Sequence, residues 1–265
     1  MFFYSEATGS SGTTDPIEPT VIPDTYDPYF ANVSLLLKAD GANNSTTFVD
    51  SSPNNLTISR FGETKISTVN SKYGSSSIYF DGNGDYLTVP SNNNLNFGTG
   101  SFTIEMWINP TVASNTQQKY LFGKRANVAS YNWMVSLMDY VNNSTTSNKY
   151  RLYFYASFNG TSWGISKSFV GSQYINPNVW THLAYVRNGS DWKAYINGIG
   201  YSLGTSSDSI SFDASAFGIG TNTGGAPSTA NSAYRGYIDD LRVTKGVARY
   251  TTNFTPPNSL HTTGA

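Results

Sequence analysis

VWTHLAYVRNGSDWKAYING, residues 179–198, is the stretch of the sequence that decides the fold. Residues 180–187 are mostly large, branched or aromatic, and such residues favour a pleated strand. Residues 188–191 are turn formers, and Asn197-Gly198 is a strong short-range signal for a hairpin. Successive side chains of a strand point to opposite faces, and both faces of the first strand carry apolar bulk. The stretch therefore predicts a three-stranded meander inside a two-layer β structure.

Strand patterns recur on both sides of this meander. Residues 101–110, SFTIEMWINP, place their aliphatic side chains on one face, and residues 234–243, YRGYIDDLRV, form the last clear strand. Residues 73–89 are two strands joined by the turn formers at 81–84. No segment shows sustained helical periodicity. Many short strands at close spacing predict an all-β fold, a two-sheet antiparallel jelly-roll sandwich.

The composition excludes several classes of function. Charged residues make up 12% of the 265-residue chain, against about a quarter in typical soluble domains, and the net charge is -1. Without a basic surplus, nucleic acid is not an expected partner. The chain has no cysteine, so it has neither a disulfide nor a thiolate metal site. No run approaches the roughly 18 apolar residues of a spanning helix, so membrane insertion is not expected.

The first 28 residues differ from the remainder of the chain. They are rich in Ser, Gly, Thr and Pro, and such a segment is extended and builds no core of its own. It is either a flexible linker or an arm that orders on a partner. In the second case the apolar anchor would be Met1, Phe2, Phe3 and Tyr4. The start lacks a basic region and a long apolar region, so no signal peptide is predicted.

Five ordered stretches resemble the successive motifs of laminin-G-like, concanavalin A-like domains. They are LLLKADGANNSTTFVDSSPNN (35–55), YFDGNGDYLTVP (79–90), SFTIEMWINP (101–110), the meander (179–198) and YIDDLRVTKGVARYTTNFTPP (237–257). The opening combined with the KGVARYTTNFTPP ending is similar to the version common in tailed-bacteriophage virion proteins. The resemblance implies a jelly roll with a concave face, usually a recognition module. The expected organisation is an arm (1–28), a sandwich (29–260) and a tail (261–265).

The resemblance also implies a function. The chain is expected to be a non-enzymatic virion protein whose lectin-like domain adheres to host-surface glycans. The alternative is a capsid or tail decoration protein whose jelly roll is a spacer anchored by the arm. A cellular carbohydrate-binding module is a third option, against which the missing secretion signal counts. Expected partners are other virion proteins, host polysaccharide and further copies of the chain, and the expected location is the virion.

Catalysis is not predicted. Related hydrolases use carboxylates clustered on one strand, and a retaining pair needs its two carboxyl groups about 5 Å apart on one side. Glu105 is the only carboxylate in its strand, and Asp239 and Asp240 are adjacent, so alternation places them on opposite faces. Residues 160–164, GTSWG, fit a nucleophile elbow, but the ISKSFV that follows predicts a strand rather than the required helix. His182 is expected to be structural.

Calcium is the one cofactor that the sequence leaves open. The related family often holds this ion between an early Asp loop and other strand ends, and hard oxygen ligands in loops suit it. Asp40 and Asp50 stand at loop starts, and Asp239 lies on the last strand, which is often a neighbour of the first. These three residues are the candidate ligands of Ca2+. Alternatively, Asp40 and Asp50 bind their own backbone in turns, and Asp239 pairs with Arg242 or Arg235.

Glycan binding would use aromatic side chains, because the apolar face of a sugar stacks on a ring while nearby amides and hydroxyls satisfy its rim. The candidates on the central strands and their loops are Tyr131, Trp133, Tyr153, Tyr155, Trp163 and Trp192. Most aromatic residues of a sandwich belong to its core. Trp107 and Trp180 lie in the clearest strands and are expected there.

Overall fold

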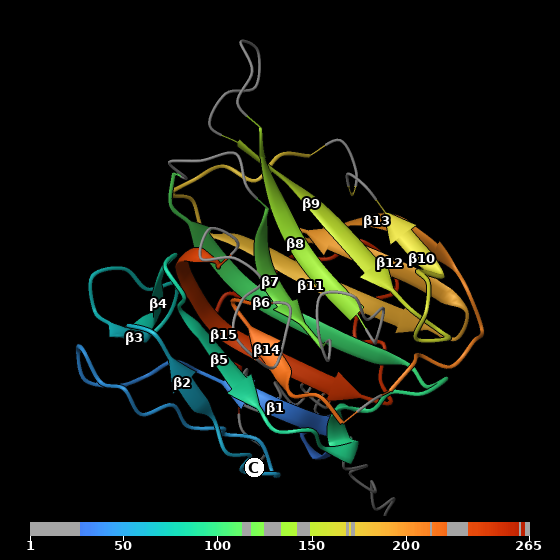
Figure 1. The fold of residues 1–265 in the computed structure, drawn as a ribbon, viewed down its shortest axis with the longest axis horizontal. Coiled ribbons are helices and arrows are strands. Elements are labelled where there is room, and N and C mark those ends of the chain that lie inside the picture. Colours follow the sequence, from blue (N-terminus) through green and yellow to red (C-terminus); the bar gives the residue numbers. More distant parts are fainter. Residues whose placement is uncertain are drawn as a thin grey trace, which may run out of the picture.

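A computed structural model of the chain describes residues 27–112, 118–124, 134–141, 149–167, 170, 173–212, 214–221, 233–259 and 261–262. Within these residues the regular structure is strand, apart from two single 3-10 turns, η1 (Phe30–Asn32) and η2 (Asn93–Leu95). The described part of the chain contains no helix with the length and apolarity needed to cross a membrane. Two antiparallel sheets form a sandwich (Figure 1), so the predicted all-β jelly roll is confirmed.

The first sheet, called sheet A, contains the predicted meander. Its described strands are β1 (Val33–Leu37), β3 (Lys65–Ser67), β4 (Ser77–Asp81), β6 (Phe102–Pro110), β11 (Thr181–Asn188), β12 (Asp191–Ile196), β13 (Ile199–Thr205) and β15 (Arg235–Lys245). They are ordered β13-β12-β11-β6-β15-β4-β3, and β1 pairs with β15 beside β4. The first and last strands are therefore neighbours, as the sequence predicted.

The second sheet, called sheet B, covers the inner face of sheet A. Its described strands are β2 (Ser59–Phe61), β5 (Tyr86–Val89), β7 (Lys119–Gly123), β8 (Met134–Val141), β9 (Lys149–Ala156), β10 (Ile165–Lys167) and β14 (Phe217–Ile219). The order is β10-β9-β8-β7-β14-β5-β2. Leu183 and Tyr185 of β11 point toward sheet B, and the Tyr185 ring stacks on Phe154 of β9 with centroids 5.5 Å apart.

The hairpins of the meander follow the turn residues of the sequence. Gly189 and Ser190 connect β11 to β12, and Asn197 and Gly198 connect β12 to β13. Asn197 and Gly198 have φ angles of 49° and 79°, the left-handed backbone that a two-residue hairpin turn requires. The predicted three-stranded meander is therefore confirmed.

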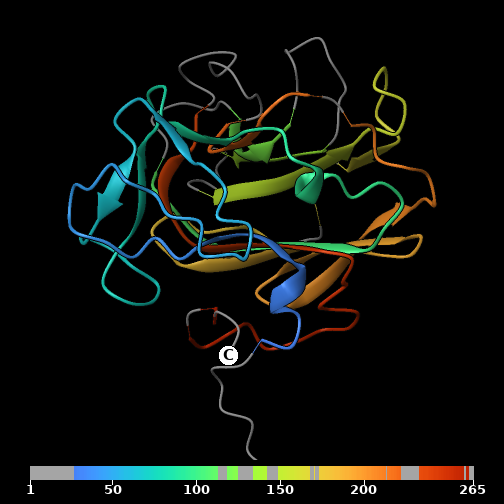
Figure 2. The same cartoon turned by 90° about the horizontal axis from the view of Figure 1, so that it is seen from below.

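The outer face of sheet A is covered by the end of the chain. We call residues 246–259 together with 261–262 the C-terminal segment, and Figure 2 shows it outside the layer that contains β11 and β12. Its Tyr250 and Phe254 pack against Ala184 and Val186 of β11. The backbone N–H of Phe254 donates to the carbonyl of Gly198 over 3.0 Å. This segment explains the apolar bulk on the second face of β11.

The last strand, β15, contains an irregularity that sequence alternation does not reveal. Asp239 pairs in register with Trp107, but Arg242 pairs with Glu105, so two residues of β15 oppose one residue of β6. Asp240, inside this bulge, has a φ of 49°, which a non-glycine residue rarely adopts. Because of the extra residue, Arg242 points to the outer face of sheet A, opposite Glu105.

Candidate functional site

Four aromatic residues gather on the outer face of sheet B, and we call them the aromatic patch. They are Tyr120 of β7, Tyr153 and Tyr155 of β9, and Trp163 of the loop before β10. They form a cluster separate from the main core, and Tyr153 is 8% exposed while the other three are half-buried. The rings of Tyr155 and Trp163 lie 5.4 Å apart and are tilted by 38°.

Local sequence accounts for the position of this patch. Leu152, Phe154 and Ala156 of β9 point into the core, so the alternate residues Tyr153 and Tyr155 point outward. Tyr120 and Tyr153 both pair in register with Leu137 of β8, one from each side, so they share one cross-strand row.

The loop that carries Trp163 is fixed by its own polar groups. The hydroxyl of Ser157 donates to the carbonyl of Ser162 over 2.7 Å, and the N–H of Gly164 donates to the carbonyl of Ala156 over 2.9 Å. The side-chain oxygen of Asn159 accepts the backbone N–H of Ser162. These hydrogen bonds therefore hold the loop of Trp163 beside β9, the strand that carries Tyr155.

The predicted glycan contacts divide into three groups. Tyr153, Tyr155 and Trp163 lie together in the aromatic patch. Trp192 requires a correction, because it is 1% exposed in the core between the sheets and its Nε1–H donates to the carbonyl of Ser206. Tyr131 and Trp133 lie outside the described residues, as do the proposed anchors Met1 to Tyr4. Tyr120 was not predicted, because only the register across β8 reveals its proximity to Tyr153.

The first candidate calcium ligand, Asp50, organises its own loop. Its Oδ1 accepts the backbone N–H groups of Leu36 and Ser52, each over 2.9 Å, and its Oδ2 accepts the N–H of Leu56 over 2.7 Å. The Ser52 hydroxyl donates to the same Oδ2. Both carboxylate oxygens are occupied by donors, which corresponds to the turn interpretation of this residue.

The other two candidates also have separate surroundings. Asp239 is buried, and its Oδ2 accepts the backbone N–H groups of Lys72 and Tyr73, while burial raises its pKa to about 7. Asp40 is exposed. Among the residues that the structure describes, no group of three acidic or histidine side chains is arranged to hold a metal ion. Asp40, Asp50 and Asp239 therefore form no such group among the described residues.

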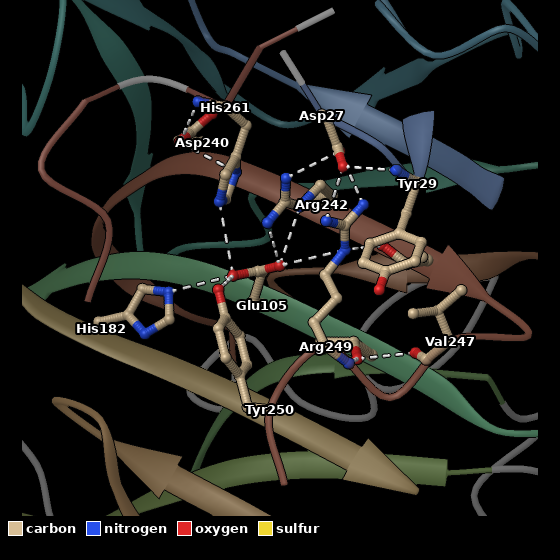
Figure 3. A network of polar contacts seen from close by, with 12 residues as sticks. Asp27, Tyr29, Glu105, His182, Asp240, Arg242, Val247, Arg249, Tyr250 and His261 are labelled. Atoms are coloured by element: carbon tan, nitrogen blue, oxygen red, sulfur yellow. Dashed lines mark hydrogen bonds and ion pairs between the residues drawn. The ribbon is translucent and has the colours of Figure 1, made fainter. Parts of the chain in front are cut away.

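A buried polar network lies on the outer face of sheet A, beneath the C-terminal segment (Figure 3). At its centre Glu105 of β6 is 0% exposed. Its Oε1 accepts Nε–H and Nη2–H of Arg242 over 2.9 and 2.7 Å, and its Oε2 accepts the hydroxyl of Tyr250 over 2.7 Å. Burial opposes ionisation of Glu105, but the Arg242 guanidinium outweighs it and holds the pKa of this carboxyl well below its usual value.

The start of the described chain joins the same network. Asp27 lies in the expected arm, but its side chain is only 6% exposed. The guanidinium of Arg249 donates to both of its oxygens, over 2.9 and 2.7 Å, and Arg242 donates to Oδ2 over 3.1 Å. Burial opposes the charge of Asp27, but Arg249 outweighs it and lowers the pKa. Arg242 therefore pairs with Glu105 and Asp27 rather than with Asp239.

The described carboxylates of this network, Asp27, Glu105 and Asp240, are all buried. Its central carboxylate is covered by protein, so Glu105 cannot reach a substrate. Ile165, which follows the GTSWG stretch, begins strand β10 rather than a helix. The strand expected after this stretch is confirmed for Ile165–Lys167. His182 is fully buried and faces Glu105, as expected of a structural histidine.

The profile of the family described as the concanavalin A-like lectin/glucanases superfamily matches residues 81–249, well over half of the chain. This chain belongs to that family. No curated protein sequence matches the concanavalin A-like chain significantly. The match includes the aromatic patch and most of the buried network, but it names no binding residue.

Solved structures share the fold of this concanavalin A-like chain at low identity. The binding domain of Paraclostridial Mosquitocidal Protein 1 has a TM-score of 0.59 at 18% identity, over 84% of this chain and 50% of that one. The botulinum neurotoxin serotype C1 binding domain has a TM-score of 0.55 at 18% identity, over 83% of this chain and 50% of that one. Domain 4 of AbnA, a GH43 arabinanase from Geobacillus stearothermophilus, was solved with arabinotriose. It has a TM-score of 0.52 at 19% identity, over 82% of this chain and 94% of that one. The chain spans about half the length of the two toxin domains.

Proposed function

We propose that this concanavalin A-like chain is a non-catalytic domain that binds a glycan on its aromatic patch. The observation that carries the proposal is the convergence of Tyr153, Tyr155 and Trp163 with Tyr120 outside the core of sheet B. Rings in such a position offer apolar faces to the C–H groups of a sugar, and their polar atoms can meet its hydroxyls. The arabinotriose complex of the AbnA domain supports the idea that this fold can carry a sugar site.

The positions of the two ends of the described chain also support the aromatic patch as the binding face. Asp27 and His261, the first described residue and nearly the last, both lie in the buried network on the outer face of sheet A. The aromatic patch lies on the outer face of the opposite sheet. A domain held through either end therefore presents the patch away from its attachment.

Binding is tested by removing one ring at a time. Tyr155→Ala and Trp163→Ala are each expected to weaken binding about fivefold, because a lost stacking contact is worth on the order of 1 kcal/mol and a tenfold change corresponds to about 1.4 kcal/mol. A printed glycan array selects the probe, and titration calorimetry with the strongest oligosaccharide measures the affinity. Tyr79→Ala is the matched control, because Tyr79 is also half-buried but lies on the outer face of sheet A.

Two results would refute this site. One is unchanged affinity in both patch variants, with melting temperatures like that of the unaltered protein. The other is an equal loss of affinity in the Tyr79→Ala control. If the array shows no oligosaccharide bound by the unaltered protein, the glycan proposal itself fails.

The finer proposal is that the domain is displayed on a phage particle and anchored through its arm. It is supported by the resemblance of residues 35–55 and 245–257 to virion proteins. Deleting residues 1–26 is expected to leave the melting temperature almost unchanged, since all five family motifs lie after Asp27, and to abolish incorporation into particles. Mass spectrometry of purified particles measures incorporation. Normal incorporation of the truncated chain would place the anchor elsewhere, and incorporation of a chain that binds no glycan would favour the decoration alternative.

A further inference from the structure

The C-terminal segment contains a buried histidine near its end. His261 is 4% exposed, and its backbone N–H donates to Oδ2 of Asp240 over 2.9 Å. Its ring lies between two carboxylates, with Nδ1 3.0 Å from Oδ2 of Asp240 and Nε2 3.4 Å from Oε2 of Glu105. These are ion-pair distances without the angles of hydrogen bonds, and among the described residues neither ring nitrogen has a hydrogen-bond partner. Figure 3 shows the ring between the two acids.

The two ring nitrogens restrict the protonation state of His261. A neutral imidazole carries one N–H and one lone pair, whereas an imidazolium carries two N–H groups. In a neutral ring, one lone pair would face a carboxylate oxygen in a site that excludes water. Only the imidazolium presents a positive N–H to both Asp240 and Glu105.

The charges around the ring also favour the protonated form of His261. The carboxylates are Glu105 of β6, Asp240 of β15 and Asp27, and the guanidiniums are those of Arg242 and Arg249. Three negative charges face two positive ones, so a protonated His261 balances the network. A buried charge without a partner is costly, and this favours the third cation.

The other titratable groups near the ring do not supply that cation. His182 of β11 faces Glu105 at 3.5 Å, but burial lowers its pKa and keeps it neutral. Tyr250 donates its hydroxyl to Glu105 and keeps its proton. Asp239, next to Asp240, faces Lys72 and Tyr73 instead, and Asp40 adds a further negative charge toward Asp240.

We propose that the end of the C-terminal segment is a pH-dependent latch, closed by the His261 imidazolium between Asp240 and Glu105 and opened by its deprotonation. Burial opposes protonation of His261, but Glu105 and Asp240 outweigh it, so its pKa lies above the ordinary 6.5. A raised pKa means that the stabilisation is complete below the unfolded value and is lost as the pH rises through the folded value. Opening releases residues beyond Pro257, while Tyr250 and Phe254 stay packed on sheet A.

Nuclear magnetic resonance of the full chain tests the latch directly, because the chain has only two histidines. In protein labelled at the histidine rings, the signal that disappears in His261→Gln is expected to titrate above pH 6.5. The backbone amide of His261 is expected to lose protection from exchange along the same curve, after correction for the intrinsic rate. One pH unit above the midpoint, where a tenth of the rings remain protonated, protection is expected to be roughly tenfold lower than one unit below.

Two variants keep the test decisive. Asp240→Asn removes one carboxylate and is expected to lower the pKa of His261. His182→Gln is expected to leave the pH dependence of amide protection at His261 unchanged. A His261 signal that titrates at or below pH 6.5 would overturn the proposal. So would amide protection at residue 261 that does not change with pH. Neither outcome depends on glycan binding, so this inference stands or fails independently of the aromatic patch.

Discussion

Replacing Glu105 with alanine is expected to lower the free energy of unfolding by about 3–5 kcal/mol, the usual cost of breaking a buried ion pair by removing one partner. The substitution removes the main acceptor of the Arg242 guanidinium and the carboxylate oxygen to which the Tyr250 hydroxyl donates, in a site that is closed to water. Urea unfolding followed by tryptophan fluorescence measures the change. The midpoint is expected to fall without a change in slope.

Two further variants show whether the effect belongs to the ion pair. Glu63→Ala removes an exposed carboxylate and is expected to change stability by less than about 0.5 kcal/mol. Adding Arg242→Met to Glu105→Ala is expected to cost less than the sum of the two single changes, because their effects are coupled through one contact. A loss of under about 1 kcal/mol for Glu105→Ala, or strict additivity in the double variant, would show that the pair is not the centre of this network.

Gly198→Ala is expected to detach the C-terminal segment and to cost about 3 kcal/mol or more. Gly198 has a φ of 79°, where a Cβ atom costs roughly 1–2 kcal/mol. The added Cβ would lie 1.8 Å from the carbonyl oxygen of Phe254, so the backbone of the segment must move, and forced packing of this kind costs roughly 1–3 kcal/mol more. Phe254 would then lose its contact with Tyr195, whose ring centroid lies 5.2 Å away.

Gly189→Ala is the matched control, because Gly189 also has a left-handed φ, 59°, but an added Cβ there meets nothing within 4 Å. In chemical unfolding, Gly189→Ala is expected to lose only the free energy that a Cβ atom costs at a left-handed φ. Gly198→Ala is expected to lose this and, in addition, the free energy of the forced contact with Phe254. Limited proteolysis is expected to cleave the C-terminal segment faster in Gly198→Ala. Equal destabilisation in the two variants would mean that the contact with Phe254 contributes nothing.

The outer faces of the two sheets therefore have different expected roles. The outer face of sheet A is closed by the C-terminal segment and the buried charges, so its substitutions are expected to change stability. The outer face of sheet B carries the half-buried rings of Tyr155 and Trp163, so their substitutions are expected to change binding. Measuring melting temperature and affinity for every variant separates the two effects.

The sequence by itself determined the elements and the class of fold. Alternation in residues 101–110 and 180–187, and the turn residues Asn197 and Gly198, are local features, and they correctly placed β6, β11 and both hairpins. The outward direction of Tyr153 and Tyr155 also follows from alternation within one strand. Local pattern was enough for these features because a strand needs no distant contact to set the direction of its side chains.

Tertiary structure alone decided which side chains meet. Trp192 has the aromatic character of a sugar platform, but the packing of the two sheets buries it. The bulge at Asp240 shifts the alternation of β15 by one residue, so Arg242 reaches Glu105, 137 positions away, rather than Asp239. Arg249 and Asp27 are 222 positions apart, and nothing in either local sequence predicts their pairing. Such contacts arise only when the sheets and both chain ends close on one another, because Coulomb attraction in a dry site depends on distance in space and not along the chain.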